Sequence, residues 1–129
     1  MKERRRRRSH DPYRALCLQL EHVRAEGELD ALVVAMDNGL LVAGAGERSV
    51  CEALGAIAPL MSSPSFNGCV PGALVGQRIE VRSISLEGET VYVASLGRST
   101  GDQWIARSAG GVRRILGYAP LTATQLLVN

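Results

Sequence analysis

Residues 31–61 read ALVVAMDNGLLVAGAGERSVCEALGAIAPLM, and this stretch decides the fold. Two short apolar runs, 29–36 and 40–43, flank Asp37-Asn38-Gly39. Asn-Gly between apolar runs is the strongest local signal for a β-hairpin, because both turn positions need a positive φ. The stretch therefore predicts two antiparallel strands that are closed by Asn38-Gly39.

The residues after this hairpin predict a turn and then a helix. Gly44-Ala45-Gly46 is interpreted as the turn through which the chain leaves the sheet. Ser49 and Glu52 match the capping box, in which each side chain satisfies an otherwise unpaired backbone N–H at the start of a helix. Pro59 predicts that this helix bends or ends early. Its apolar stripe consists of Val50, Leu54, Ile57 and Met61, and its small residues are Ala53, Gly55, Ala56 and Ala58.

The glycines of this stretch also suggest a phosphate-binding loop, but the pattern is incomplete. Gly39 and Gly44 have the spacing of a Walker loop, and the lysine that must follow is absent. Residues 44–49 nearly match a dinucleotide-binding loop, but the preceding strand belongs to a hairpin and Glu47 would lie beside the pyrophosphate. A turn that leads into a helix is therefore the favoured interpretation.

The flanking sequence predicts a helix before the hairpin and a second hairpin after it. Asp11-Pro12 is a good helix start, and Gly27 ends that helix. Residues 77–86 and 90–96 are predicted strands. Their hydrophobic alternation shifts phase between Val81 and Ile84, which indicates a bulge or a strand buried on both faces at one end.

The remaining segments predict a loop and a last helix. Residues 62–76 are rich in proline and glycine, so we expect a loop with one short edge strand near 73–75. A helical stripe from Asp102 to Gly117 follows, with Gly110-Gly111 weakening its middle and Trp104 as its anchor. The whole pattern predicts an α+β domain in the order αββαβββα, with a central antiparallel sheet of about five strands and helices on its faces.

Length and charge divide the chain into a tail, one domain and an extension. The 129 residues carry a net charge of +2, of which residues 1–10 contribute +5 and the rest −3. We expect a basic tail at 1–10, a single domain at 11–118 and a C-terminal extension at 119–129. No apolar run approaches the roughly 18 residues that span a bilayer, so a soluble cytoplasmic protein is expected.

Candidate catalytic groups are few. Cys17, Cys51 and Cys69 lie at unrelated spacings, which favours free thiols over disulfides or a metal site. His22 is interpreted as a partly exposed helical histidine. Gly97-Arg98-Ser99-Thr100-Gly101 matches a nucleophile elbow, but no histidine follows it to complete a triad. We expect no enzyme activity, no cofactor and no metal.

Residues 31–45 and 51–60, in this order of elements, resemble the roadblock/dynein-light-chain family of longin- and profilin-related fold. The resemblance covers about residues 11–118 and rests on an apolar strand that ends in Asp-x-Gly, a second strand that ends in a small-residue turn, and an alanine-rich helix. It implies a non-enzymatic homodimer or heterodimer that binds and regulates small Ras-like GTPases or connects larger assemblies. Second helices and edge strands would pair across a two-fold axis.

The resemblance and the low relief of the second helix together place a dimer or partner interface on that helix. The residues predicted to form it are Val50, Ala53, Leu54, Ile57, Ala58 and Met61. The alternative hypothesis is an electrostatic module that binds nucleic acid or a membrane surface through its arginine run. That run consists of Arg4, Arg5, Arg6, Arg7 and Arg8. A small hydrolase or nucleotide-binding enzyme is the third hypothesis.

Overall fold

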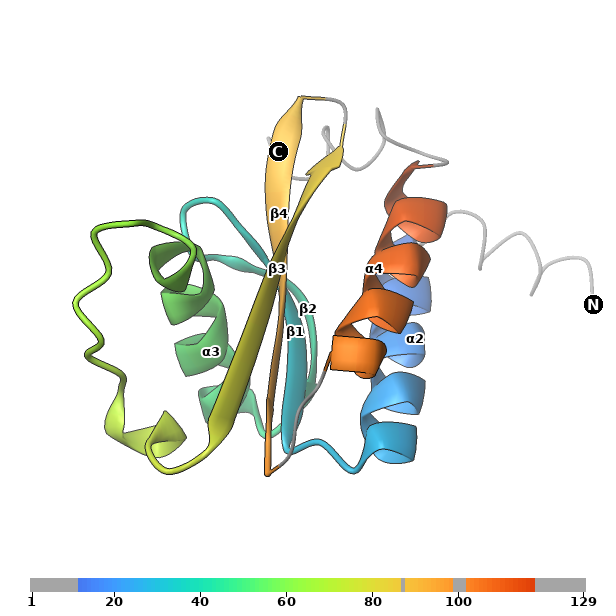
Figure 1. The fold of residues 1–129 in the computed structure, drawn as a ribbon. Coiled ribbons are helices and arrows are strands. Elements are labelled where there is room, and N and C mark those ends of the chain that lie inside the picture. Colours follow the sequence, from blue (N-terminus) through green and yellow to red (C-terminus); the bar gives the residue numbers. More distant parts are fainter. Residues whose placement is uncertain (1–11, 87, 99–101, 118–129) are drawn as a thin grey trace, which may run out of the picture.

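The computed structural model describes residues 12–86, 88–98 and 102–117. An antiparallel sheet forms the middle layer, with α2 and α4 on one face and α3 on the other (Figure 1). The described elements are α2 (Pro12–Gly27), β1 (Ala31–Met36), β2 (Leu41–Gly46), α3 (Arg48–Met61), the 3-10 helix η1 (Gly72–Leu74), β3 (Arg78–Leu86), β4 (Glu89–Gly97) and α4 (Asp102–Gly117). This arrangement confirms the predicted α+β class.

The sheet has four strands in the order β2-β1-β4-β3, one fewer than the sequence predicts. Residues 73–75 do not form an edge strand, because local hydrogen bonds hold Ala73 and Leu74 in η1 and Val75 in the turn that follows it. The N–H of Leu74 donates to Pro71 O (2.9 Å) and that of Val75 to Gly72 O (3.3 Å). Within the described chain, β3 is therefore left as an edge of the sheet.

The inner strand β1 divides the core into two halves. Ala31–Ala35 are all buried, because β1 has a strand on each side and helices over both faces. Leu32 and Val34 face α2 and α4, while Ala31 and Val33 face α3. Side chains thus alternate between the two faces with the period of two that is typical of a strand. The sequence shows no apolar–polar alternation here, because both faces are apolar.

Strand β3 has no bulge at the expected position. Its pairing with β4 runs without a shift from Arg78↔Gly97 to Leu86↔Glu89. Ile79 and Val81 pack on the α3 side, whereas Ile84 is buried on the α2 and α4 side. The apparent phase shift arises because the two halves of the strand bury opposite faces.

The first hairpin forms as predicted but with a different turn. Only Gly39 takes a positive φ, of 87°, and Asn38 instead contributes a side-chain acceptor to the Leu40 N–H (3.0 Å). The Gly39 N–H donates to Met36 O (2.9 Å). The register then shifts between Val34 and Ala35, so β2 carries one extra residue.

The glycine cluster after the hairpin belongs to the sheet, which corrects the predicted turn. Gly44, Ala45 and Gly46 pair with Val33, Leu32 and Ala31. A Cβ at Gly44 would lie 3.3 Å from Cys51 Sγ, so this glycine lets α3 pack closely on β2. Gly46 alone has a positive φ, of 124°, where the chain turns toward α3.

The capping box is also absent. Glu47 is the N-cap residue of α3, with extended backbone, and Ser49 lies inside the helix. The Ser49 hydroxyl donates to Glu47 Oε1, while Glu52 pairs with Arg48 Nε at 3.4 Å. The Glu47 carboxylate at the N-cap still complements the helix dipole. Pro59 does not end the helix early, since α3 continues to Met61.

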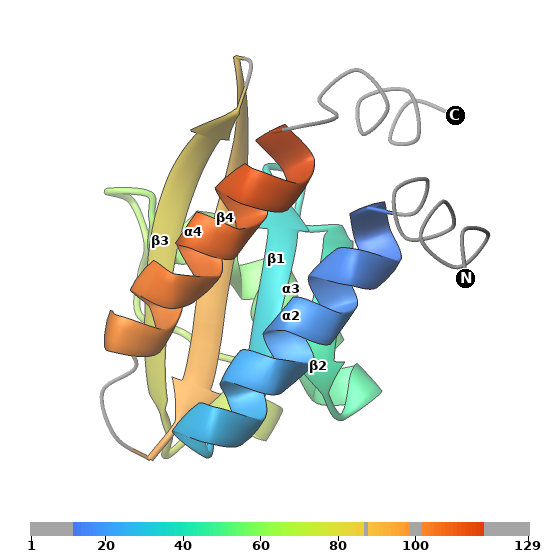
Figure 2. The ribbon, with the colours of Figure 1, turned by 90° about the vertical axis from the view of Figure 1, so that its right-hand side faces the viewer.

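Helices α2 and α4 lie side by side on one face of the sheet (Figure 2). Their close approach needs two glycines. A Cβ at Gly27 would lie 2.9 Å from the Trp104 ring, and one at Gly111 would lie 3.0 Å from Gln19 Cγ. Helix α4 runs through Gly110-Gly111 without a break, and Trp104 packs against the core under it as predicted.

Several predicted features lie outside the described residues. These are the helix cap at Asp11, the arginine run Arg4–Arg8, the extension 119–129 and the serine of the nucleophile-elbow pattern, Ser99. In the described part of the chain, no helix is both long and apolar enough to cross a membrane.

Candidate partner-binding face

Helix α3 is apolar around most of its circumference, so it has both a core-facing and a solvent-facing apolar side. No charged residue occurs between Glu52 and the end of the helix at Met61. A helix that covers one face of a sheet normally has a polar outer side. The composition of α3 therefore indicates a second contact on its outer side.

The structure divides the six predicted interface residues into two groups. Leu54, Ile57 and Ala58 are at most 4% exposed and pack on their own sheet. They belong to the core because they lie on the strongest apolar stripe of the helix. Val50, Ala53 and Met61 pack against the same core but are only half-buried, so part of each side chain stays open to solvent.

Gly55 has a structural role that the sequence did not suggest. It is buried, and a Cβ there would lie 2.5 Å from Leu41 Cδ2 of β2. The smooth surface around Gly55 and Ala58 thus fits α3 to its own sheet, not to a second helix.

The exposed side of α3 carries two residues outside the predicted six, and we call this side the α3 outer face. It consists of the exposed Ala56 and Leu60 and the half-buried Ala53, which follow one another on one side of the helix, and Glu52 borders it. Leu60 is 58% exposed. This face is small, apolar and low in relief.

The tip of the first hairpin adjoins the α3 outer face. A Cβ at Gly39 would lie 3.4 Å from Ala56 Cα, so the turn lies against the helix backbone at that residue. The next residue, Leu40, is 63% exposed. Leu40 and Leu60 are absent from the predicted interface, and Ala56 enters the prediction only as a small residue beside the stripe, because the interface was assigned to the stronger stripe; the lack of charge after Glu52 was the available signal.

A hollow lies at the carboxyl end of α3. Its volume is about 350 Å³, and it is open to solvent. The lining residues are Leu60, Ser63, Ser65, Phe66, Asn67 and Cys69. Leu60 therefore belongs both to this hollow and to the α3 outer face.

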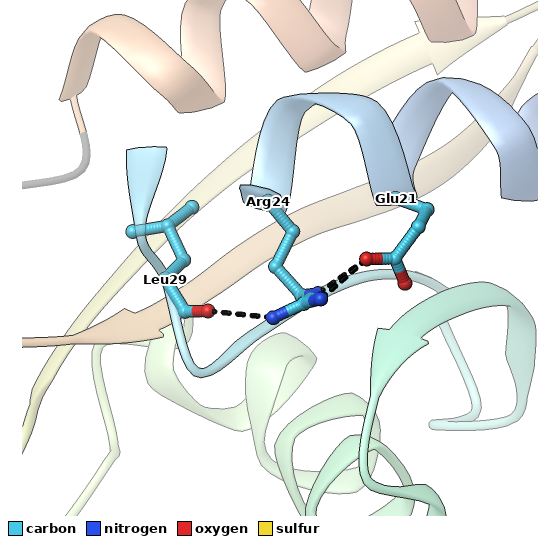
Figure 3. A network of polar contacts seen from close by, with 3 residues as sticks. All are labelled: Glu21, Arg24 and Leu29. Atoms are coloured by element: carbon cyan, nitrogen blue, oxygen red, sulfur yellow. Dashed lines mark hydrogen bonds and ion pairs between the residues drawn. The ribbon is translucent and has the colours of Figure 1, made fainter. Parts of the chain in front are cut away.

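The main polar network of the described chain fixes the end of α2 (Figure 3). Arg24 Nε donates to Glu21 Oε2 (2.9 Å), Arg24 Nη2 binds the same oxygen, and Nη1 donates to Leu29 O (3.2 Å). The hydrogen bond to Glu21 raises the pKa of Arg24. The contacts hold the turn between α2 and β1, which is a structural role.

That turn corrects the role predicted for Gly27. The residue in the left-handed region is Glu28, with φ 53°, and the N–H of Leu29 donates to Arg24 O (3.0 Å) while that of Glu28 donates to Ala25 O (3.3 Å). This bond pair is a Schellman motif, which usually uses glycine at the left-handed position. Gly27 is instead needed where Trp104 packs on it.

The thiols and the described histidine do not assemble into a reactive group. Cys51 is buried, Cys17 is half-buried and Cys69 is exposed, and all three are free. Burial raises the pKa of the Cys51 thiol, although the nearby Arg24 guanidinium lowers it. His22 is exposed, with its Nε2 at 3.6 Å from Glu26 Oε1. Among described residues, no three His, Cys, Asp or Glu side chains gather as a metal site.

Comparison with known proteins shows the fold. No family model and no curated protein sequence matches the chain. A solved structure of MglB from Myxococcus xanthus, a roadblock-family protein, is similar with a TM-score of 0.56, over 82% of this chain and 90% of the MglB chain. The two sequences are 10% identical. The likeness confirms the roadblock-like fold and transfers no residue role.

Proposed function

We propose that this roadblock-like chain is a non-enzymatic regulatory or adaptor protein of the cytoplasm. It pairs with a second roadblock-like subunit and binds a small Ras-like GTPase. The similar protein MglB is a roadblock-family GTPase-activating protein, which supports this class of partner. The proposal needs no cofactor, because such a protein acts through its surface.

The observation that carries the proposal is the α3 outer face. Ala56 and Leu60 form an uncharged exposed ridge, and the exposed Leu40 lies on the turn that packs against it. Contiguous exposed apolar residues with a polar border mark protein contacts, whereas single exposed leucines do not. Glu52 and Arg48 supply the polar border at the start of the helix.

The residues at the edge of this face extend the contact. Val50, Ala53 and Met61 are half-buried, so a partner can cover the exposed part of each side chain without disturbing the core. Leu54, Ile57 and Ala58 act indirectly, since they hold the helix on the sheet. We assign the partner contact to the α3 outer face and its half-buried neighbours. We assign the positioning of α3 to the three buried residues.

The test is a bulky charge in the middle of the ridge. Ala56→Arg places a guanidinium where a partner would bury a methyl group, and we expect it to weaken binding at least about 10-fold. Ala25→Arg is the matched control, because Ala25 is an exposed alanine on α2, on the other side of the sheet. Binding is measured by fluorescence polarisation against a panel of purified Ras-like GTPases loaded with a fluorescent GTP analogue.

Two results would overturn the proposal. One is that no GTPase of the panel binds the unaltered protein. The other is that Ala56→Arg and Ala25→Arg weaken binding equally. The alternative hypothesis, electrostatic binding through Arg4–Arg8, concerns residues outside the described chain and gains no support from a described contact.

A further inference from the structure

Helices α2 and α4 run antiparallel, so the start of α2 lies beside the end of α4. Gly27, the last residue of α2, lies against Trp104 near the start of α4, whereas Gly111 lies against Gln19 in the middle of α2. The contacts thus move along the two helices in opposite directions. In Figure 2 the first turn of α2 and the last turn of α4 lie at the same end of this layer.

Three arginines are exposed at this end of the α2 and α4 layer, which we call the basic end. Arg14 lies in the first turn of α2, and Arg113 and Arg114 lie near the end of α4. Neither Arg113 nor Arg114 forms a salt bridge with another described residue. Leu18, one turn after Arg14, is 58% exposed. The basic end therefore combines positive charge with an exposed apolar side chain.

The charges of this layer are distributed unevenly. Arg107, nearer the start of α4, pairs with Glu26 at 2.6 Å. At the basic end, burial and the nearby carboxylate of Glu89 raise the pKa of Tyr13, so Glu89 offsets part of the charge there. The two arginines at the end of α4 still keep their charge available to a partner.

Two segments outside the described residues attach to the basic end. Residues 1–10 precede α2 and carry Lys2 and Arg4–Arg8 against Glu3. An extended chain of four residues spans at most about 14 Å, so Arg8 can act only near the start of α2. Residues 118–129 follow α4 and read YAPLTATQLLVN, without a charged side chain. Basic and apolar groups thus leave the domain from one place.

We propose that the basic end docks on an anionic membrane surface. Arg113, Arg114 and Arg4–Arg8 bind the phosphates of lipid headgroups, which guanidinium groups hold through paired hydrogen bonds. Leu126 and Leu127 insert their side chains among the acyl chains beside them. A basic segment alone binds a membrane reversibly, and stable attachment takes a second, apolar signal.

The uncharged segment favours a membrane over nucleic acid as the partner. Nucleic acids attract arginine through the same phosphate chemistry but offer no apolar phase for Leu126 and Leu127. Single strands also stack on aromatic side chains, whereas Tyr13 and Trp104, the aromatic residues of α2 and α4, are half-buried. A lipid surface is the partner that uses both the charge and the apolar side chains.

This inference goes beyond the proposed function and does not depend on it. Helices α2 and α4 cover one face of the sheet, and α3 covers the other (Figure 1). A membrane at the basic end therefore leaves the α3 outer face available to a GTPase.

The first test reverses one charge of the basic end in the full chain. Arg114→Glu should weaken binding to vesicles at least about 5-fold, because each basic group near an anionic surface adds to binding. Arg48→Glu is the matched control, since it makes the same change at a side chain that is 91% exposed at the start of α3. Flotation with phosphatidylcholine vesicles that contain about 30% phosphatidylserine measures binding. Circular dichroism checks that each variant is folded.

The second test separates apolar insertion from charge. Salt at about 1 M screens charges beyond about 3 Å, so vesicle binding that remains there reports insertion. The double variant Leu126→Gln, Leu127→Gln should abolish this remaining binding. The same variant should bind double-stranded DNA no differently from the unaltered protein, as measured by fluorescence polarisation.

The outcomes are distinct. Loss in Arg114→Glu but not in Arg48→Glu, together with loss of salt-resistant binding in the leucine variant, supports membrane docking. Equal losses in the two charge variants, or salt-resistant binding that survives the leucine variant, would overturn it. Binding to DNA without binding to the vesicles would also overturn it. The effect of Ala56→Arg on GTPase binding is measured without lipid, so the two proposals can fail separately.

Discussion

Single glycines in this protein have unequal roles, and the surroundings of each one decide its role. Gly46 has a φ of 124°, and a Cβ there would lie 2.6 Å from the carbonyl oxygen of Asp30. Gly68 has a φ of 87° but no atom near its Cβ position. A side chain at Gly46 would therefore have both an unfavourable φ and a clash with the backbone. A side chain at Gly68 would have only the unfavourable φ.

Gly46→Ala should therefore lower the free energy of unfolding by about 3 kcal/mol or more, and the control Gly68→Ala by about 1 kcal/mol. The larger effect arises because the Asp30 backbone cannot move without disturbing the start of β1. Urea denaturation followed by circular dichroism measures both values. Equal losses in the two variants would contradict the role assigned to the clash.

Helices α2 and α4 contact each other through the Trp104 ring and through an ion pair. Trp104 packs against the core and over Gly27. The centroid of its ring lies 5.7 Å from the guanidinium carbon of Arg107. Arg107 Nη1 also pairs with Glu26 Oε1 at 2.6 Å. Both side chains of that ion pair are more than 40% exposed, so solvent weakens it.

Packing should outweigh charge at this contact. Trp104→Ala should cost about 2–3 kcal/mol of unfolding free energy, because it removes a ring that fills the gap between two helices. Glu26→Gln, which breaks the ion pair and keeps the shape, should cost less than about 1 kcal/mol. Urea denaturation by circular dichroism measures both, and a larger loss in Glu26→Gln would refute this ranking.

The elements also show what sequence patterns could and could not establish. Both hairpins and three helices form where the apolar periods and the Asn38-Gly39 signal predict them. The capping box at Ser49 fails because capping depends on the backbone conformation of Glu47, which the sheet sets. The extra strand at 73–75 fails because local hydrogen bonds after Pro71 satisfy its backbone.

The molecule as a whole should lose stability in alkaline solution. Burial is the main cause of raised pKa values for Cys51, Tyr13 and Tyr92, and Asp37 adds to the shift at Tyr92 through a hydrogen bond of 3.2 Å. The folded state therefore holds these protons more tightly than the unfolded chain. Their contribution to the free energy of unfolding is fully present below the pKa values of the unfolded chain. It is lost as the pH rises through the pKa values of the folded state.

Cys51 should begin this loss above about pH 8.5, and the two tyrosines should add to it above about pH 10. The Cys51 contribution cannot exceed about 1.4 kcal/mol per pH unit. Urea denaturation between pH 7 and 10.5 measures the decline. Cys51→Ala should remove the first stage, while Cys69→Ala, at an exposed thiol, should not; identical profiles for both variants would contradict the prediction.

The sequence by itself determined the α+β class, the two hairpins and the three helices, because these follow from local apolar periods and turn residues between Pro12 and Gly117. The resemblance of residues 31–45 and 51–60 to roadblock proteins also predicted the roadblock-like fold. Tertiary structure alone decided which side of α3 is free and that β3 is an edge. Leu54 and Leu60 are equally apolar, and only the position of the sheet buries one and exposes the other. Periodicity shows that a helix has an apolar face, but packing decides what that face contacts.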